Sequence, residues 1–316
     1  MKNYNTYMQS TSQLKIELRT KVTMRIEEMK GCGLVYQTPR CHPFVKWAGG
    51  KSQLVPQIIH LMPAKFTRYF EPFLGGGAVF FHIASYNRNA FLSDINTDLI
   101  NAYKVIRNHV EELIPVLNYH QNEYNKSPKN YYYYLRDSTR VFNKIDTSAR
   151  FIALNKTCYN GLYRVNKNGL FNVPIGRYKN PIICDADNLR IMSVVLKQSG
   201  SNLGVSDYKK ILVEKAEKDD FIYLDPPFHP ISNTANFTSY TNNGFTLEDQ
   251  KELAIIFNEL TRRGCKLLLS NSNTEEIRRL YSDYSHLTEV TTVNRSINAV
   301  ASKRVGHTEL LIRNYC

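Results

Sequence analysis

The stretch Asp225-Pro226-Pro227-Phe228 closes an apolar run, Phe221-Ile222-Tyr223-Leu224, which has the length and composition of a buried strand. Two consecutive prolines cannot continue a strand ladder, so they fix the main chain just past the strand end. The sequence therefore predicts an acidic corner with an aromatic ring at the carboxyl edge of a sheet, where open α/β sheets bind ligands. The Asp225 carboxylate and the Pro226 carbonyl could accept both hydrogens of one exocyclic amino group, with Phe228 stacked on the ring that carries it. A structural Pro-Pro turn fits these four residues equally well when they are taken alone.

The 316-residue chain is basic, with 41 Lys and Arg residues against 28 Asp and Glu, a formal net charge of +13 and a pI near 9.3. The surplus is concentrated in two segments: residues 126–190 carry 12 basic and 4 acidic residues, and residues 1–51 carry 9 and 3. The remainder is close to neutral. Two separated basic segments favour a polyanionic partner.

Cysteines and apolar runs exclude several classes of protein. None of the 6 cysteines forms a CxxC pair and the histidines are scattered, so we expect reduced thiols and no metal site. No run approaches the roughly 18–20 apolar residues of a membrane span, and the amino terminus lacks the apolar segment of a signal peptide. We expect no membrane partner. Residues 1–40 form a polar N-terminal extension to which we assign no function.

The first glycine motif is Lys46-Trp47-Ala48-Gly49-Gly50-Lys51-Ser52. It ends like a P-loop, but Val45 stands where that loop requires its first glycine, so a phosphate-binding loop is disfavoured. A Gly-Gly turn between Trp47 and Lys51 suits a ligand with an aromatic ring and a carboxylate.

The second glycine motif is Glu71-Pro72-Phe73-Leu74-Gly75-Gly76-Gly77. We predict a strand through about 70–73, a glycine turn and a helix beginning near Ala78. Glycines let the main chain approach a ligand, and a helix amino end favours a negative group. The spacing is not GxGxxG, which argues against a dinucleotide pyrophosphate.

A second predicted strand, 90–93, ends at Asp94. In nucleoside-binding α/β units, an acid at the end of the second strand binds the ribose hydroxyls. The alternative is that Asp94 caps a helix over 96–107. The glycine turn about 20 residues upstream favours the ribose interpretation.

Residues 110–200 interrupt the alternation of strands and helices. We predict helices around 111–124, 130–145 and 148–157. A polar stretch follows over 158–178, where Asn168-Gly169 is typical of a hairpin turn with a short strand on each side. Its Arg, Asn, Lys and Tyr residues fit a DNA groove. The alternative is a solvated surface ribbon, but the local basic surplus favours DNA.

The alternation returns after residue 200. We predict a strand near 202–205, a polar loop over 229–245, a helix over 247–262, a strand over 266–270, a helix over 274–281 and a closing pair near 287–293 and 307–312. The strands before 110 and after 200 are predicted to form one sheet.

In combination and order, these motifs resemble the Dam-type family of S-adenosylmethionine-dependent DNA adenine-N6 methyltransferases, from about Phe44 to Arg313. The resemblance rests on Lys-Trp-Ala-Gly-Gly-Lys at 46–51, Glu-Pro-Phe-Leu-Gly-Gly-Gly at 71–77, Asp-Ile-Asn at 94–96, Tyr-Asn-Gly-Leu at 159–162, Phe-Asn-Val-Pro at 171–174 and Asp-Pro-Pro at 225–227. This chain has Phe228 where tyrosine is usual. Stacking requires the ring and not the hydroxyl, so we expect activity to survive.

The resemblance implies an α/β fold: a Rossmann-like class I methyltransferase sheet with an inserted, mostly helical DNA-recognition domain that carries a β-hairpin. The expected domains are a catalytic domain over 41–109 and 201–316 and a target-recognition domain over 110–200. It also implies a monomer that acts on double-stranded DNA in the cytoplasm, associated with the nucleoid.

Residue roles follow from the resemblance. Trp47, Lys51, Asp94 and Asp225 would bind S-adenosylmethionine, which leaves as S-adenosylhomocysteine, and Phe73, Gly75 and Gly77 would shape the pocket. The target adenine would leave the duplex and stack on Phe228, and its amino group would bond to Asp225 and the Pro226 carbonyl. No metal is needed.

For DNA, the resemblance makes Tyr159 a wedge in the base stack. Leu162, Arg164 and Pro174 would lie on base edges, with Arg164 as the guanine reader. Lys46 would reach the outer guanine of the half-site, and together these residues suggest GATC. Asn166 on the hairpin would also contact DNA, and Arg177 would hold a phosphate.

Two alternatives stay open at this level. One is a methyltransferase of RNA or of a protein glutamine side chain, which would leave the basic hairpin unexplained. The other is a non-catalytic DNA-binding regulator, against which the intact Asp225, Asp94 and Lys51 argue. The sequence also leaves open whether the enzyme belongs to a restriction-modification system.

Overall fold

The computed structural model describes residues 41–84, 89–138, 143–228, 245–293 and 307–316. The N-terminal extension 1–40 and nearly all of the predicted loop 229–245 lie outside the described residues. Residues 41–316 form one compact unit, so the predicted division at 109/110 and 200/201 stays a prediction. No helix in the described ranges is long and apolar enough to cross a membrane.

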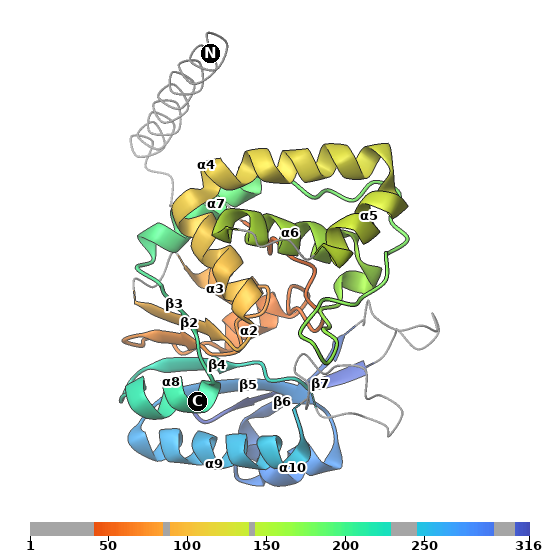
Figure 1. Ribbon diagram of the computed structural model, residues 1–316. Coiled ribbons are helices and arrows are strands. Elements are labelled where there is room, and N and C mark those ends of the chain that lie inside the picture. Colours follow the sequence, from red (N-terminus) through yellow and green to blue (C-terminus); the bar gives the residue numbers. More distant parts are fainter. Residues whose placement is uncertain (1–40, 85–88, 139–142, 229–244, 294–306) are drawn as a thin grey trace. The chain divides into compact units, whose positions relative to one another are not determined.

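A seven-stranded sheet organises the described residues, in the order β3-β2-β1-β4-β5-β7-β6 (Figure 1). The first five strands in this order, β3, β2, β1, β4 and β5, run parallel to one another. Strand β7 is antiparallel to both of its neighbours, β5 and β6. The strands are β1 (Tyr69–Glu71), β2 (Ala90–Asp94), β3 (Asn202–Val205), β4 (Phe221–Leu224), β5 (Lys266–Ser272), β6 (Thr288–Val293) and β7 (His307–Arg313). The α/β sheet predicted from the sequence is confirmed.

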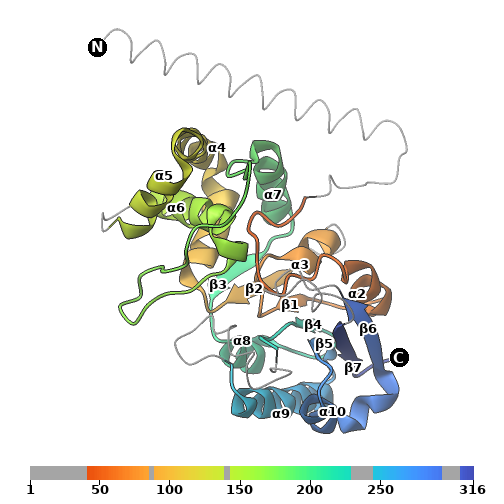
Figure 2. The ribbon, with the colours of Figure 1, turned by 90° about the vertical axis from the view of Figure 1, so that its right-hand side faces the viewer.

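Both faces of the central strand β4 are buried. Along β4, Phe221 and Tyr223 belong to one apolar cluster, whereas Ile222 and Leu224 belong to another. This alternation is the two-residue period of a strand covered on both sides, which explains why the run is apolar throughout. Figure 2 shows α2 (Val55–Leu61) and α3 (Ala78–Ile83) on one side of the sheet, and α8 (Tyr208–Lys215), α9 (Leu247–Arg263) and α10 (Glu275–Leu280) on the other.

The order of the strands locates the ligand-binding edge. Strand β1 lies between β2 and β4, so the chain builds outward in one direction through β2 and β3 and in the other through β4 and β5. A crevice opens at the carboxyl ends of the strands where such a sheet reverses its order. The motifs that end β1, β2 and β4 therefore meet at one edge.

Helix α4 (Thr97–Lys126) carries the chain from the sheet into the insert. Its amino end is capped by Asn96, and His109 has non-helical angles (φ −135°, ψ 33°). Figure 1 shows two limbs of α4 on either side of this bend. The helix contacts β2 and β3 as well as α6 (Lys144–Thr157) and α7 (Ala186–Gln198).

Several predicted boundaries inside the insert are wrong. The two helices predicted over 130–145 and 148–157 form as α5 (Pro128–Asp137) and α6, but the break between them lies earlier, because the Asn143 side chain accepts the amide hydrogens of Ile145 and Asp146 and caps the start of α6. The helices predicted over 96–107 and 111–124 are the two limbs of α4, and the break predicted between them is the bend at His109. Helices α2, α7 and α8 were not predicted.

The predicted hairpin forms, but without its two strands. Only isolated bridges join its arms, at Val165↔Phe171 and Cys158↔Ile175. Its tip is closed by the Asn166 side chain, which accepts the amide hydrogens of Asn168 and Leu170 at 2.9 and 3.0 Å. Main-chain hydrogen bonds from the Asn166 amide to the Leu170 carbonyl and from the Asn172 amide to the Arg164 carbonyl belong to the Val165↔Phe171 bridge, and no regular ladder extends from it.

Candidate active site

The Asp-Pro-Pro-Phe corner meets the first glycine motif. The Asp225 Oδ1 atom lies 2.8 Å from the Lys51 Nζ atom, and the two side chains are 19% and 6% exposed. Lys51 also donates to the Gly49 carbonyl at 2.7 Å and lies 4.4 Å from the centre of the Phe228 ring. Burial raises the pKa of Asp225, and the Lys51 ammonium opposes that rise. This ion pair was not predicted from the sequence.

A second carboxyl group lies beneath the corner. Glu71, at the end of β1, is 2% exposed and accepts a hydrogen bond from the Tyr69 hydroxyl at 2.8 Å. Burial raises its pKa to about 8, and the negative charge of Asp225 adds to the rise. Asp225 is the acid that pairs with an ammonium, whereas Glu71 is bonded to the neutral Tyr69 hydroxyl and stays mostly protonated at neutral pH.

Replacement of Glu71 by Gln is expected to flatten the dependence of stability on pH. The folded pKa of Glu71 lies above its unfolded value, so the unfolded chain binds fewer protons between about pH 4.5 and 8. Stability contributed by this group is therefore lost as pH rises through that window, by about 1 kcal/mol per pH unit at most. Urea unfolding of both proteins across the window measures the difference, and a gap that does not change with pH would contradict the expectation.

The glycine turn is tied to the end of β2 by Asp94. Its two oxygens accept the amide hydrogens of Gly75 and Asn96, both at 2.9 Å. Burial raises the pKa of Asp94, and these main-chain donors lower it. The alternative role as helix cap is wrong, because Asn96 caps α4 by accepting from the Leu99 amide at 2.9 Å. Asp94 therefore fixes the turn and presents a carboxylate at the sheet edge.

Glycine is required at two positions of this turn. Gly75 has φ +48°, and a Cβ atom there would lie 2.8 Å from Cδ1 of Trp47. Gly77 has φ +68°, and a Cβ atom there would lie 2.7 Å from the hydroxyl of Tyr103, which donates to the Gly75 carbonyl. The turn thus lies directly against the Trp47 ring, a contact that was not predicted from the two motifs.

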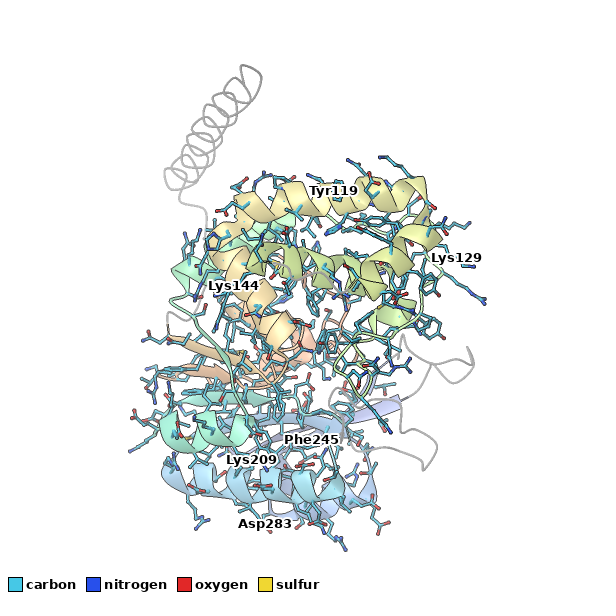
Figure 3. All side chains as sticks on the ribbon, in the orientation of Figure 1. Tyr119, Lys129, Lys144, Lys209, Phe245 and Asp283 are labelled. Carbon is cyan, nitrogen blue, oxygen red and sulfur yellow. The ribbon has the colours of Figure 1, made fainter. Side chains whose placement is uncertain are left out.

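Aromatic side chains surround Phe73, which follows β1. The Phe73 ring lies 5.0 Å from Tyr208 and 6.0 Å from Phe245, measured between ring centres. Phe245 precedes α9 (Figure 3). No role was predicted for Tyr208 or Phe245, because neither residue belongs to a recognisable sequence motif. Together they give the carboxyl edge an apolar wall.

The residues predicted to recognise DNA near 159–174 are joined to the first glycine motif by Asn155. This side chain is 1% exposed; it accepts from the Lys46 amide at 2.7 Å and donates to the carbonyls of Lys46 and Gly161 at 2.9 and 3.1 Å. A Cβ atom on Gly161 would collide with Lys46. Tyr159, 41% exposed, begins the same turn, and its amide donates to the Pro174 carbonyl at 2.8 Å. The structure thus groups Lys46, Tyr159 and Pro174.

The remaining predicted DNA contacts lie on the hairpin and its base. The Arg164 Nε and Nη2 atoms donate to the side-chain and main-chain oxygens of Asn172, at 2.7 and 3.1 Å. Leu162 is half-buried against the main apolar cluster, whereas Arg164 and Arg177 are exposed. Because Asn166 uses its side-chain oxygen to close the hairpin tip, its contact with DNA stays a prediction.

Lys46 has neighbours that the sequence did not predict. Its ammonium donates to the Lys156 carbonyl at 3.1 Å and lies 3.2 Å from the centre of the Tyr178 ring. Burial lowers the pKa of Lys46, and the charge of Lys156 lowers it further. The cation is therefore held in a fixed place beside the turn that carries Tyr159.

Several lysines between residues 129 and 179 are exposed. Lys129 lies in the first turn of α5 and Lys144 begins α6, and both side chains are exposed (Figure 3). Lys167 and Lys179 are exposed on the hairpin and beyond its base. Among the described residues, no group of three or more His, Cys, Asp or Glu side chains is arranged to hold a metal ion.

The sheet has this strand order, an antiparallel strand β7, and acidic and glycine motifs at its carboxyl edge. Together these features define a Rossmann-like methyltransferase fold. The family comparison then narrows the class. The profile of the D12 class N6 adenine-specific DNA methyltransferases matches residues 47–295, so the chain belongs to that family. Its members depend on S-adenosylmethionine, and the predicted family, enzyme class and cofactor are confirmed.

The chain aligns with three curated relatives over most of their length. The chain is 41% identical over 279 residues to the Type II methyltransferase M1.LlaDCHI of Lactococcus lactis subsp. cremoris, covering 86% of this chain and 95% of that one. It is 43% identical over 293 residues to the Type II methyltransferase M.MjaIII of Methanocaldococcus jannaschii, covering 86% and 99%. The DNA adenine methylase of Escherichia coli K12 is 34% identical over 268 residues, covering 85% and 93%.

Proposed function

We propose that this enzyme methylates the N6 amino group of an adenine that leaves the duplex, within the sequence GATC. The observation that carries the proposal is the meeting of Asp225 and Phe228 with Lys51 at the carboxyl edge of β4. An ionised acceptor and a flat ring in one corner suit a planar ring that bears an amino group.

The residues at the carboxyl edge of the sheet have the chemistry needed to bind S-adenosylmethionine. The glycines of the turn bring its main chain directly against the Trp47 ring, because a side chain on Gly75 would collide with that ring. Asp94 would take the ribose hydroxyls, which are donors that suit a carboxylate. Phe73 and its aromatic neighbours would pack on the adenine ring of the cofactor. When bound, the cofactor supplies an electrophilic methyl group.

The residues of the corner would act on the target amine. The amino nitrogen of adenine is a poor nucleophile because its lone pair is delocalised into the ring. Hydrogen bonds to the Asp225 carboxylate and the Pro226 carbonyl would favour a pyramidal nitrogen and restore the lone pair. Phe228 would hold the ring plane by stacking. Positioning and fixed charges then supply most of the acceleration.

Recognition of GATC is proposed from the grouping at the insert. Lys46, Tyr159 and Pro174 lie together through Asn155 and the Tyr159–Pro174 hydrogen bond. Asn172 supports one side of the Arg164 guanidinium, which is consistent with the outer fork reaching the two acceptors of a guanine edge. Arg177 and the exposed lysines would contribute affinity without sequence information.

Replacement of Arg164 by Ala is expected to relax discrimination at one base pair by about 1–3 kcal/mol, because a bidentate contact to guanine is lost. The measurement compares binding to duplexes that differ at each position of the site. Replacement of Arg177 by Ala is the matched control, which should weaken all sequences alike and reduce the salt dependence. If Arg164→Ala behaves like Arg177→Ala, Arg164 is a phosphate contact.

The function itself is tested by transfer of labelled methyl groups to duplex oligonucleotides. Incorporation is expected with GATC duplexes and is expected to be lost when the adenine of that site is replaced. Plasmid from cells that express the protein should gain resistance to a nuclease that cuts only unmethylated GATC, and sensitivity to one that cuts only methylated GATC. Labelling of RNA or of protein in place of DNA would overturn the proposal.

A further inference from the structure

We propose that Gln250 and Asn271 are positioning residues, which hold the main chain of the Asp225–Phe228 corner in the geometry that methyl transfer requires. This inference rests on the proposed function, because it assigns a purpose to the Pro226 carbonyl and the Phe228 ring. Neither residue lies in a motif that the sequence analysis used.

The two side chains form a chain of hydrogen bonds that ends on the corner. The Gln250 Nε2 atom donates to the Pro227 carbonyl at 2.9 Å, and its Oε1 atom accepts from the Asn271 Nδ2 atom at 2.9 Å. The Asn271 Oδ1 atom accepts from the Ser272 amide at 2.8 Å. Both amide side chains are 0% exposed.

Rigid elements hold both members of the pair. Gln250 lies in the first turn of α9, which is fixed by a capping box of Thr246 and Asp249. Asn271 lies in β5, two residues past Leu269, which pairs with Leu224 at the end of β4. The strand register therefore places Asn271 beside the corner, and β7 supports it from the other side through Leu310.

The chemistry of proline explains why such a pair is needed. Pro226 and Pro227 have no N–H group, so this part of the corner can be anchored only through its carbonyls. A hydrogen bond to the Pro227 carbonyl fixes the plane of the peptide that leads into Phe228, and with it the direction in which the ring leaves the main chain. It also restrains the preceding Pro226 carbonyl.

The cost of burial argues against a role in packing alone. Two fully buried amides are unfavourable unless they are bonded, and apolar side chains of similar size would fill the same space without that penalty. These amides are bonded to each other and to one carbonyl of the corner. A satisfied buried polar pair specifies a position more sharply than apolar packing does.

Replacement of Gln250 by Leu, which retains volume and removes the amide, is expected to lower the single-turnover rate of methyl transfer by about 10- to 100-fold. Binding of cofactor and of duplex DNA should not change. Asn314→Leu is the matched control, because Asn314 also joins α9 to β5, at the opposite end, through Thr261 and Leu267. The control should lose stability without a loss of rate constant.

Gln250→Glu provides a second readout. When protonated, the carboxyl group can donate to Pro227 and accept from Asn271, whereas the ionised form has no donor. Burial raises the pKa of such a group, so the rate of the variant should fall relative to the parent as pH rises through that pKa. The pH dependence of the Gln250→Glu rate therefore tests the positioning role even if Gln250→Leu fails to fold.

The outcomes are distinct. A parental rate for folded Gln250→Leu, an equal loss of rate in Asn314→Leu, or a parental pH profile for Gln250→Glu would overturn the inference. Full activity of Asp225→Ala in the same assay would instead overturn the proposed function, whatever the behaviour of Gln250.

Discussion

Asp225→Ala is expected to lower the rate of methyl transfer to duplex DNA by about 10²- to 10³-fold. The substitution removes the ionised acceptor that lies 2.8 Å from Lys51 and leaves the target amine with the Pro226 carbonyl alone. Because the interaction matters most as the nitrogen becomes pyramidal, the loss should appear in the single-turnover rate and less in DNA affinity. The measurement is single-turnover transfer with saturating DNA and cofactor.

Asp225→Asn is the companion variant. It keeps the size of the side chain and one acceptor oxygen, and removes the charge. An intermediate rate would separate the contribution of the charge from that of the acceptor. Transfer by Asp225→Ala at the parental rate, with the protein folded, would show that the corner does not act on the amine.

Replacement of Lys51 by Met is expected to destabilise the fold by about 3–5 kcal/mol at neutral pH, because it leaves a largely buried carboxylate without its partner. The loss should depend on pH. Burial already raises the pKa of Asp225 and Lys51 opposes that rise, so the variant raises it further. A folded pKa above the unfolded value costs stability as pH rises between the two, so the destabilisation should shrink when the carboxyl group is protonated in acid.

Urea unfolding of the parent and of Lys51→Met, from acid to neutral pH, measures this dependence. The control is the double variant Lys51→Met with Asp225→Leu, which removes both charges and should recover part of the stability. A loss that is the same at every pH, or that the second substitution does not relieve, would show that the ion pair is not its origin.

Local sequence patterns located some strand ends and missed others: the strand predicted over about 70–73 is β1 (Tyr69–Glu71), and the one predicted over 266–270 continues to Ser272. The apolar run 221–224 and the acid after 93 are both where the sequence placed them, because alternation and strand-breaking residues act over a few positions. The pairing of Lys51 with Asp225 could not be predicted from spacing, since it depends on where the glycine motif before α2 lies relative to the end of β4. No role was predicted for Gln250 or Asn271, whose side chains are buried in α9 and β5.

The insert was predicted less well for a related reason. The limits of its helices depend on caps such as Asn143 and on tertiary contacts more than on apolar periodicity. The predicted hairpin turn forms, but isolated bridges and not regular strands join its arms.

The bend in α4 at His109 has a consequence for engineering. The helix contacts β2 and β3 and continues past the bend into a second limb, so the predicted division at 109/110 falls at the bend, between two limbs that both carry buried apolar side chains. A chimera cut there would interrupt that helix and expose apolar side chains on both fragments. Exchange of target specificity with a relative should therefore transplant α4 whole, together with the sheet contacts that receive it.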